Sequence, residues 1–178
     1  MDSSSLVMVL VTAVLTVLVA TTSRAAAVEN DVWVLTYSPV WRGFVKLAWL
    51  FPVVIAVVCV FSPPKAGERW IPFAIIIGFS ALNLPLSLEV FKRRIELAEN
   101  KITQYSAWSD PVTIAWLDVR EVVWKLSNEL HVRSKRGVLV RISMHLSGMD
   151  TLADEFETRL PHVPGIEKIA ARLRAKHI

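Results

Sequence analysis

The sequence of 178 residues contains a single cysteine, Cys59, which lies inside an apolar run. One cysteine cannot close a disulfide bond within the chain, and it cannot supply a cysteine-based zinc site. The chain therefore lacks the disulfide framework on which many small secreted domains depend.

The sequence also lacks the short motifs that carry common enzymatic chemistry. It contains no P-loop and no GxGxxG, GxSxG or HExxH pattern. None of its four histidines has a second ligand four residues away or a carboxylate in a ligand-like motif; they are His131, His145, His162 and His177. We therefore expect no catalytic residue, no metal site and no cofactor, and a function that is not enzymatic.

Charge is sparse in the first half of the chain and unevenly distributed in the second. Residues 1–91 hold five basic and five acidic residues, whereas residues 92–178 hold fifteen basic and eleven acidic residues. The net charge of +4 therefore arises in the second half, which favours contact with an anionic surface, and we expect no nucleic acid partner. The chain is 53% hydrophobic with a mean hydropathy of +0.45, as is typical of an integral membrane protein.

The first apolar run, Ser5–Thr22, leaves three interpretations open: a retained transmembrane helix, a cleaved signal peptide, or an over-long predicted start. Ala25–Ala27 resembles the small-residue cleavage site of a signal peptide. The residues before the run include no lysine or arginine, which disfavours a signal peptide. We expect residues 1–24 to form an N-terminal transmembrane helix or an uncleaved signal-like segment.

The next stretch, residues 25–43, is predicted to be a juxtamembrane strand and linker. Its side chains alternate as in a strand, with Val32, Val34 and Thr36 facing one way and Trp33, Leu35 and Tyr37 the other. One interpretation is a short linker with aromatic anchors at the membrane surface. The other is an extra strand added to the sheet of the C-terminal domain.

Two further apolar runs predict a transmembrane helical hairpin over residues 44–91. The first is Phe44–Phe61, in which Pro52 predicts a kink, and the second is Trp70–Phe91, which carries no charge before Glu89. About 20 helical residues cross the hydrocarbon core of a bilayer, which is about 30 Å thick. The link between the runs is short and rich in proline, so the two helices are expected to be antiparallel.

Lysine and arginine residues around this hairpin predict its orientation. The side that leads into the C-terminal domain holds five of them, Arg42, Lys46, Lys92, Arg93 and Arg94, whereas the connecting loop holds only Lys65 and Arg69. The positive-inside rule therefore places the C-terminal domain in the cytoplasm.

Asn83 is the one strongly polar side chain in the middle of a predicted span. An amide group in hydrocarbon is costly unless it is paired, so we expect Asn83 to contact another helix. A role in conduction is disfavoured because no ionisable partner accompanies it.

From Arg94 onward the apolar period changes to two, which predicts an antiparallel meander of six strands. The expected strands cover residues 94–97, 102–108, 112–116, 121–126, 130–134 and 138–147. A helix follows, capped by Asp150 or Thr151, with an apolar stripe of Leu152, Phe156 and Leu160 that closes the sheet. These elements define a domain over residues 92–162.

Three features of this region carry a resemblance to a known family. They are the turn Glu99-Asn100-Lys101 within RIELAENKITQYSAW, the segment Ile114-x-Trp116-x-Asp118-Val119, and Leu146-Ser147-Gly148 leading to Leu152. Residues 40–162 resemble the bacterial pleckstrin-homology-like (PH-like) domains that follow a two-helix membrane hairpin. The resemblance implies a membrane-anchored α+β protein of the bacterial cytoplasmic membrane, with a PH-like antiparallel β-barrel or sandwich capped by a helix. It implies no activity, because these are fold-type positions.

The basic hairpin formed by Arg133, Lys135 and Arg136 is the candidate contact for anionic lipid or an acidic partner. A charged tip that only maintains solubility is the other interpretation. Eukaryotic PH domains usually bind phosphate through their first hairpin, and here that turn, Glu99-Asn100-Lys101, has one basic residue. The resemblance therefore does not imply that this chain recognises lipid phosphates as eukaryotic PH domains do.

Residues 163–178 are expected to form an amphipathic basic tail helix. Ile166, Ile169 and Leu173 share a face and are the candidate docking residues for a partner or the membrane surface. A frayed, solvated tail is the alternative.

These observations favour a non-enzymatic accessory or scaffolding subunit of a larger integral membrane complex of respiratory, photosynthetic or export type. The expected partners are the lipid bilayer and other integral membrane proteins. The alternative is a membrane-surface sensor that binds anionic headgroups through the basic hairpin. A small transporter or enzyme would need buried ionisable groups in the spans, and these are essentially missing from the sequence.

Overall fold

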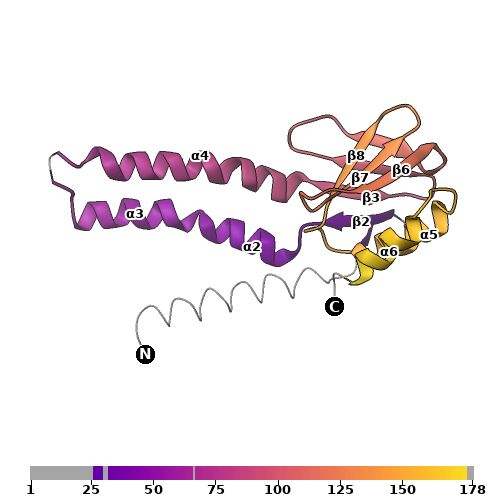
Figure 1. Cartoon of the computed structure of the whole chain (residues 1–178). Helices are drawn as coiled ribbons and strands as arrows, with labels where there is room; N and C mark the ends of the chain where they lie inside the picture. The colour runs from indigo at the N-terminus through magenta and orange to yellow at the C-terminus, as the bar shows by residue number, and fades with distance from the viewer. Residues whose placement is uncertain (1–25, 30–31, 66, 176–178) are drawn as a thin grey trace.

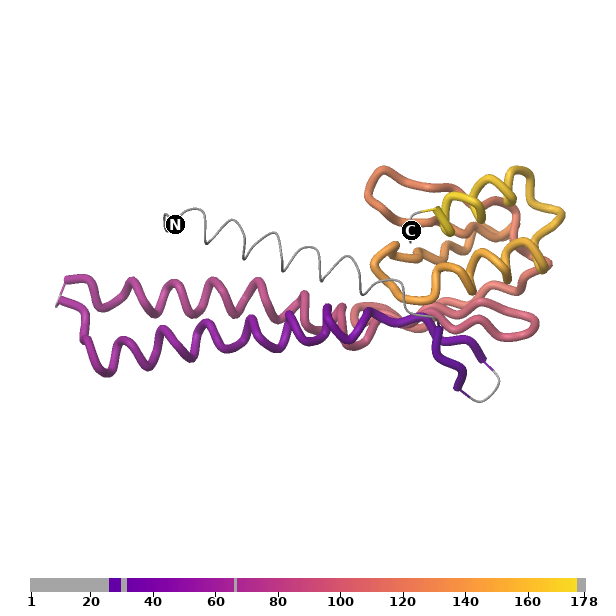
Figure 2. Tube along the Cα trace, turned by 90° about the horizontal axis from the view of Figure 1, so that it is seen from below, coloured from indigo at the N-terminus to yellow at the C-terminus, as the bar shows by residue number. Residues whose placement is uncertain are grey.

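The computed structural model describes residues 26–29, 32–65 and 67–175, so the span predicted over residues 1–24 lies outside the described residues. The molecule is elongated, with a helical hairpin at one end and an α+β domain with antiparallel sheets at the other (Figures 1 and 2). The elements in chain order are β1 (Ala27–Glu29), β2 (Val32–Thr36), α2 (Pro39–Ala48), α3 (Leu50–Phe61), α4 (Trp70–Lys92), β3 (Arg94–Leu97), β4 (Lys101–Tyr105), β5 (Val112–Ala115), the 3₁₀ turn η2 (Trp116–Asp118), β6 (Val119–Trp124), β7 (Glu129–Ser134), β8 (Leu139–Ser143), α5 (Met149–Arg159) and α6 (Ile166–Ala175).

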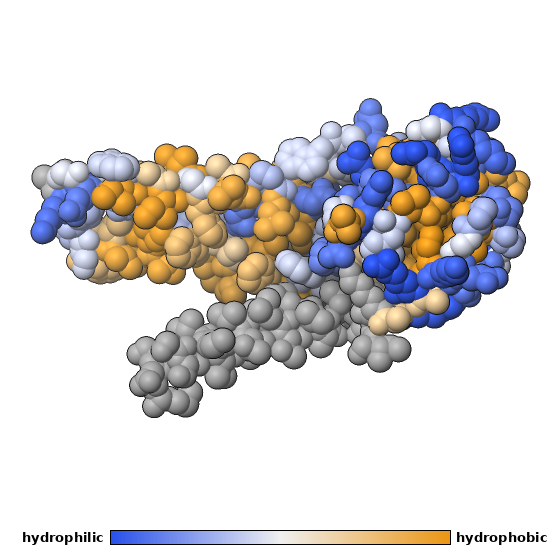
Figure 3. Space-filling view, viewed as in Figure 1, coloured by the Kyte–Doolittle hydropathy of each residue, from blue (hydrophilic) through white to orange (hydrophobic). Residues whose placement is uncertain are grey.

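Within the part of the chain that the structure describes, two helices are long and apolar enough to cross a membrane, Pro39–Phe61 and Trp70–Lys92. At about 1.5 Å per residue, the 23 residues of α4 extend for about 34 Å. Apolar side chains cover the hairpin, and polar residues gather at its loop and on the α+β domain (Figure 3). The hairpin predicted from the sequence is therefore present.

The first arm of the hairpin starts earlier than predicted. Pro39 occupies the first helical position, and the Ser38 hydroxyl accepts a hydrogen bond from the backbone N–H of Trp41, so α2 begins within the stretch assigned to a linker. The arm is interrupted at Trp49. Pro52 explains this break, because its ring clashes with the carbonyl of Ala48 four residues earlier and it lacks an N–H.

A short polar relay joins the two arms of the hairpin. The indole Nε1 of Trp49 donates to the Ser87 Oγ at 2.9 Å, and that hydroxyl donates to the backbone carbonyl of Asn83 at 2.7 Å. Asn83 itself is only 5% exposed, and within the described residues its Nδ2 has no hydrogen-bond partner. The bond between the arms is therefore made by Trp49 and Ser87.

The first sheet joins the two ends of the hairpin directly. Its strand order is β1-β2-β3-β4-β5, and β2, which precedes the hairpin, pairs antiparallel with β3, which follows it. Thr36 is registered against Arg94 and Trp33 against Leu97. The interpretation of β2 as an extra strand of the sheet is confirmed. Both arms of the hairpin thus enter neighbouring strands with at most two residues between helix and strand.

The predicted single meander of six strands is wrong, because the chain forms a second, three-stranded sheet in the order β6-β7-β8. The change of sheet occurs at η2, where the buried Trp116 leaves the ladder. Its Nε1 donates to the Ala98 carbonyl at 2.9 Å, and its backbone N–H donates to the Asn100 carbonyl. The last strand is also shorter than predicted, since residues 144–145 form a turn and Leu146 instead bridges to Tyr37.

Helix α5 buries the predicted apolar stripe of Leu152, Phe156 and Leu160 completely. Its N-cap is Gly148, which has a φ of 84° and no side chain, so the predicted caps at Asp150 and Thr151 are wrong. Both lie within the first turn of the helix, because the chain turns sharply at the left-handed Gly148.

The tail helix α6 packs against α5 and is neither frayed nor available for docking. Ile166 and Leu173 lie in the core, and Ile169 packs against it, so the predicted docking face is covered by the chain itself. Arg174 donates to Asp154 and to both carboxylate oxygens of Glu157, which are all exposed. These hydrogen bonds lower the pKa of Glu157 below its ordinary value.

Arg93 connects α4 to the second sheet at the base of the hairpin. Its side chain donates to the Glu89 Oε1 at 2.6 Å and to the backbone carbonyl of Arg141 at 2.9 Å, and it lies 3.5 Å from the Glu129 Oε1. Arg93 is only 9% exposed. This cation therefore holds the last turn of α4 against strands that are far away in sequence.

Replacing Arg93 by Met should destabilise the chain by about 3–5 kcal/mol, because two carboxylates lose their buried partner. The matched control is Arg94→Met, since Arg94 is more exposed and its contacts are an ion pair with Glu96 and the ring of Tyr105, and it should cost about 1 kcal/mol. Urea unfolding of the full chain in detergent measures both. Equal losses would contradict the role given to Arg93.

Replacing Gly148 by Ala should also be costly. A Cβ there would lie 2.6 Å from the Cβ and 2.8 Å from the backbone N of Ala26, and φ is positive. Gly137→Ala is the control, because φ is equally positive but no atom lies within 4 Å. We expect about 1–2 kcal/mol for the control and about 1–3 kcal/mol more for Gly148→Ala. The shift of the thermal midpoint measures the difference, and similar midpoints would refute the close contact.

Candidate functional site

The end of the domain away from the hairpin is built around the buried Trp116. The turn between β3 and β4 and the turn η2 meet there through the two hydrogen bonds of Trp116 to Ala98 and Asn100. The ring of Phe156 in α5 packs edge-on against Trp116, with centroids 6.2 Å apart. Both sheets and α5 therefore fix the shape of this corner.

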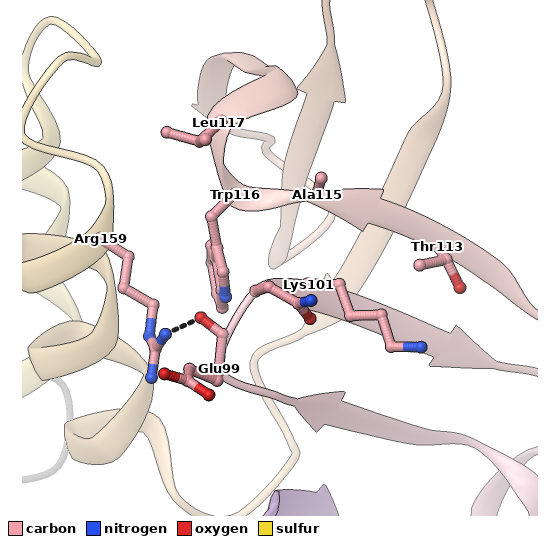
Figure 4. A pocket seen from close by; sticks show the side chains of 8 residues that line it. Glu99, Lys101, Thr113, Ala115, Trp116, Leu117 and Arg159 are labelled. Carbon is pink, nitrogen blue, oxygen red and sulfur yellow. Dashed lines mark hydrogen bonds between the residues drawn. The ribbon is translucent and has the colours of Figure 1, made fainter.

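A groove of about 720 Å³ opens beside Trp116 (Figure 4). The Arg159 side chain reaches from α5 across the groove, donates to the Glu99 carbonyl and lies 5.8 Å from the Trp116 ring centroid. Leu117 lies at one edge and is 79% exposed. The lining combines apolar side chains with two cations and one carboxylate, and it comprises Glu99, Asn100, Lys101, Thr113, Ala115, Trp116, Leu117 and Arg159.

The predicted basic hairpin packs against the same corner. The backbone N–H of Lys135 donates to the Asp118 carbonyl at 2.8 Å, and its Nζ donates to the Leu117 carbonyl at 3.0 Å. The Ser134 hydroxyl accepts from the backbone N–H groups of Arg136 and Val138, which fixes the tip. We call the groove together with Lys135 and Arg136 the distal face.

The three predicted basic residues have different environments. Arg133 donates to the Glu121 Oε1 at 2.9 Å, so an ion pair offsets its charge. Arg136 is exposed and only its backbone is tied. Lys101, an exposed lysine on the groove wall, adds a cation that the sequence did not reveal, because it lies on a different hairpin.

The distal face lies far from the membrane end of the domain. Strand β3 leaves α4 and runs four residues, about 13 Å, before the turn that holds Trp116. The basic tip contacts η2 beyond that point. Electrostatic attraction in physiological salt decays over about 8 Å. Lys135 and Arg136 therefore lie farther than this decay length from the last turn of α4.

Two further cavities lie outside the distal face. A second cavity of about 340 Å³ lies at the base of the hairpin and is bordered by the Arg93 network. A third, of about 420 Å³, lies between the arms near Cys59 and is apolar. Among the described residues, no group of three or more His, Cys, Asp and Glu side chains is placed to hold a metal ion.

Sequence reasoning found the basic tip but missed Leu117, Lys101 and Arg159. Leu117 carried a usable signal, because it directly follows Trp116 and two consecutive large apolar side chains cannot both face one core from a strand. The sequence held no signal for Arg159, since its position beside the Glu99 turn depends on how α5 packs.

No family model, no curated protein and no solved structure matches this chain. The PH-like resemblance therefore stays a prediction.

Proposed function

We propose that this chain is a non-enzymatic docking subunit of a larger membrane complex of respiratory, photosynthetic or export type. In this proposal the hairpin crosses the bacterial cytoplasmic membrane, and the domain, of PH-like type, lies in the cytoplasm. The observation that supports it best is the distal face, which gathers cations and an exposed leucine at the end of the domain away from the membrane.

The chemistry of the distal face favours a protein partner. Lys101 lines the groove together with the acidic Glu99, and Leu117 stands exposed at its edge. Lys135 donates to the Leu117 carbonyl, and Arg136 is exposed on the neighbouring tip. An acidic segment with one large apolar side chain complements this surface, with the apolar group filling the groove and the carboxylates meeting the rim. An anionic headgroup would use the cations but leave the groove and Leu117 without a role.

The absence of a linker supports docking over free diffusion of the domain. Two residues separate β2 from α2 and one separates α4 from β3, and Arg93 adds a third connection. A partner bound at the distal face is thus held at a defined distance from the membrane. This arrangement fits a subunit that positions one component of a complex relative to another.

The alternative function, sensing of anionic headgroups by the basic hairpin, is weakened by position. The tip points away from the spans, and Arg133 is already paired with Glu121. Only a second membrane facing the domain would provide headgroups at the distal face.

A photo-crosslinking amino acid at Leu117 tests the proposal in native membranes. We expect a discrete protein adduct that Lys101→Glu combined with Arg136→Glu reduces about tenfold, equivalent to about 1.4 kcal/mol. Both residues are exposed, and in the part of the chain that the structure describes no side-chain hydrogen bond holds either of them. The reversed charges repel an acidic partner.

The matched control reverses two exposed charges away from the distal face, Lys125 in the turn at the opposite end of the domain and Lys168 in α6, and should leave the adduct unchanged. An adduct insensitive to Lys101→Glu with Arg136→Glu, or equally sensitive to the control, would contradict the proposal. A lipid adduct at Leu117 in place of a protein adduct would support headgroup sensing instead.

A further inference from the structure

Two loops at the opposite end of the domain lie beside the base of the hairpin. β4 runs antiparallel to β3 and returns toward α4, with Tyr105 registered against Arg94, so the loop 106–111 follows at that end. β7 starts at Glu129, whose carboxylate lies next to Arg93, so the turn 125–128 before it lies there too. We call these two segments the base loops.

Each base loop presents a large apolar side chain to the outside. Trp108 is 60% exposed and Leu126 is fully exposed. Removing such a side chain from water is favourable. A single exposed apolar residue needs no explanation. Two such residues, on separate loops at the end that faces the membrane, require an explanation.

The level of the base loops matches the expected edge of the bilayer. Twenty residues of α4 from Trp70 reach Glu89 and cross about 30 Å. Trp108 lines the same cavity as Glu89 and Arg93 in the last turn of that helix. Trp108 therefore lies at the height where the hydrocarbon ends and the headgroups begin.

Neighbouring side chains at this height are those that interfaces favour. The Lys46 Nζ lies 5.7 Å from the Phe91 ring centroid, and the Trp41 ring packs against Phe44. Lys92 and Lys125 are exposed at the same end. Tryptophan rings and lysines with apolar stems concentrate at the boundary between hydrocarbon and water.

We infer that the base loops are a second membrane contact, in which Trp108 and Leu126 enter the headgroup interface of the bilayer that the hairpin crosses. Lys92 and Lys125 then meet lipid phosphates, which attract cations at an anionic surface. The domain is thus seated on the membrane at two loops as well as at the two arms of the hairpin. This inference rests on the membrane anchoring in the proposed function.

Depth-dependent fluorescence quenching in the full chain tests the inference. In a Cys59→Ser background, single cysteines replace Trp108, Leu126 or Leu117 and carry an environment-sensitive dye. The chain is reconstituted in vesicles that contain anionic lipid, with spin labels placed either near the headgroup or deep in the acyl chain. All three positions are exposed, so the substitutions leave the core unchanged.

We expect dyes at positions 108 and 126 to show blue-shifted emission and stronger quenching by the shallow spin label. The matched control at position 117, an exposed leucine at the distal face, should emit as in water and remain unquenched. Dye on the native Cys59, inside the hairpin, should be quenched by the deep label.

Emission at positions 108 and 126 equal to that at 117, with Cys59 still quenched, would overturn the inference and leave the anchoring intact. An unquenched Cys59 would overturn both, because the hairpin would then lie outside the bilayer. Quenching at 108 and 126 by the deep label alone would contradict an interfacial position.

Discussion

The pairing of β2 with β3 across the helical hairpin is the constraint on which the rest of the structure depends. It brings Thr36 and Arg94, which stand 58 positions apart in the chain, into register at the base of both arms. Ser147 strengthens the same point, since its backbone N–H and its hydroxyl both donate to the Thr36 carbonyl. The hairpin is thus an insertion between two adjacent strands, and its direction sets the direction of the sheet.

Much of this fold could be predicted because it depends on local periodicity. The uncharged run from Trp70 to Glu89 and the alternation around Val140 and Ile142 each report the environment of a single element. The change of sheet at Trp116 could not be predicted in this way. It depends on hydrogen bonds from that indole to a turn 18 residues earlier, and alternation continues on both sides of it.

The tail helix α6 shows that local periodicity also does not predict which surface is available for binding. Ile166 and Leu173 form an apolar face that is compatible with a partner, a membrane or the protein's own core. The packing of α6 on α5 selected the core, and only tertiary structure could reveal this. Conversely, the basic tip was visible in the sequence, but its value as a site depends on contact with η2 and on its distance from the hairpin. The contact with η2 favours the hypothesis that the basic tip docks a protein over the hypothesis that it binds lipid headgroups.

Because β2 pairs with β3 and Arg93 bonds to β8, we expect hairpin and domain to move as one body. Spin labels at Cys59 and at a cysteine replacing Leu117, in the full chain in vesicles, test it directly through their distance distribution. The account predicts a single narrow distribution that Arg93→Met broadens and Arg94→Met does not. A broad distribution in the unaltered chain, as for a domain on a flexible tether, would contradict it.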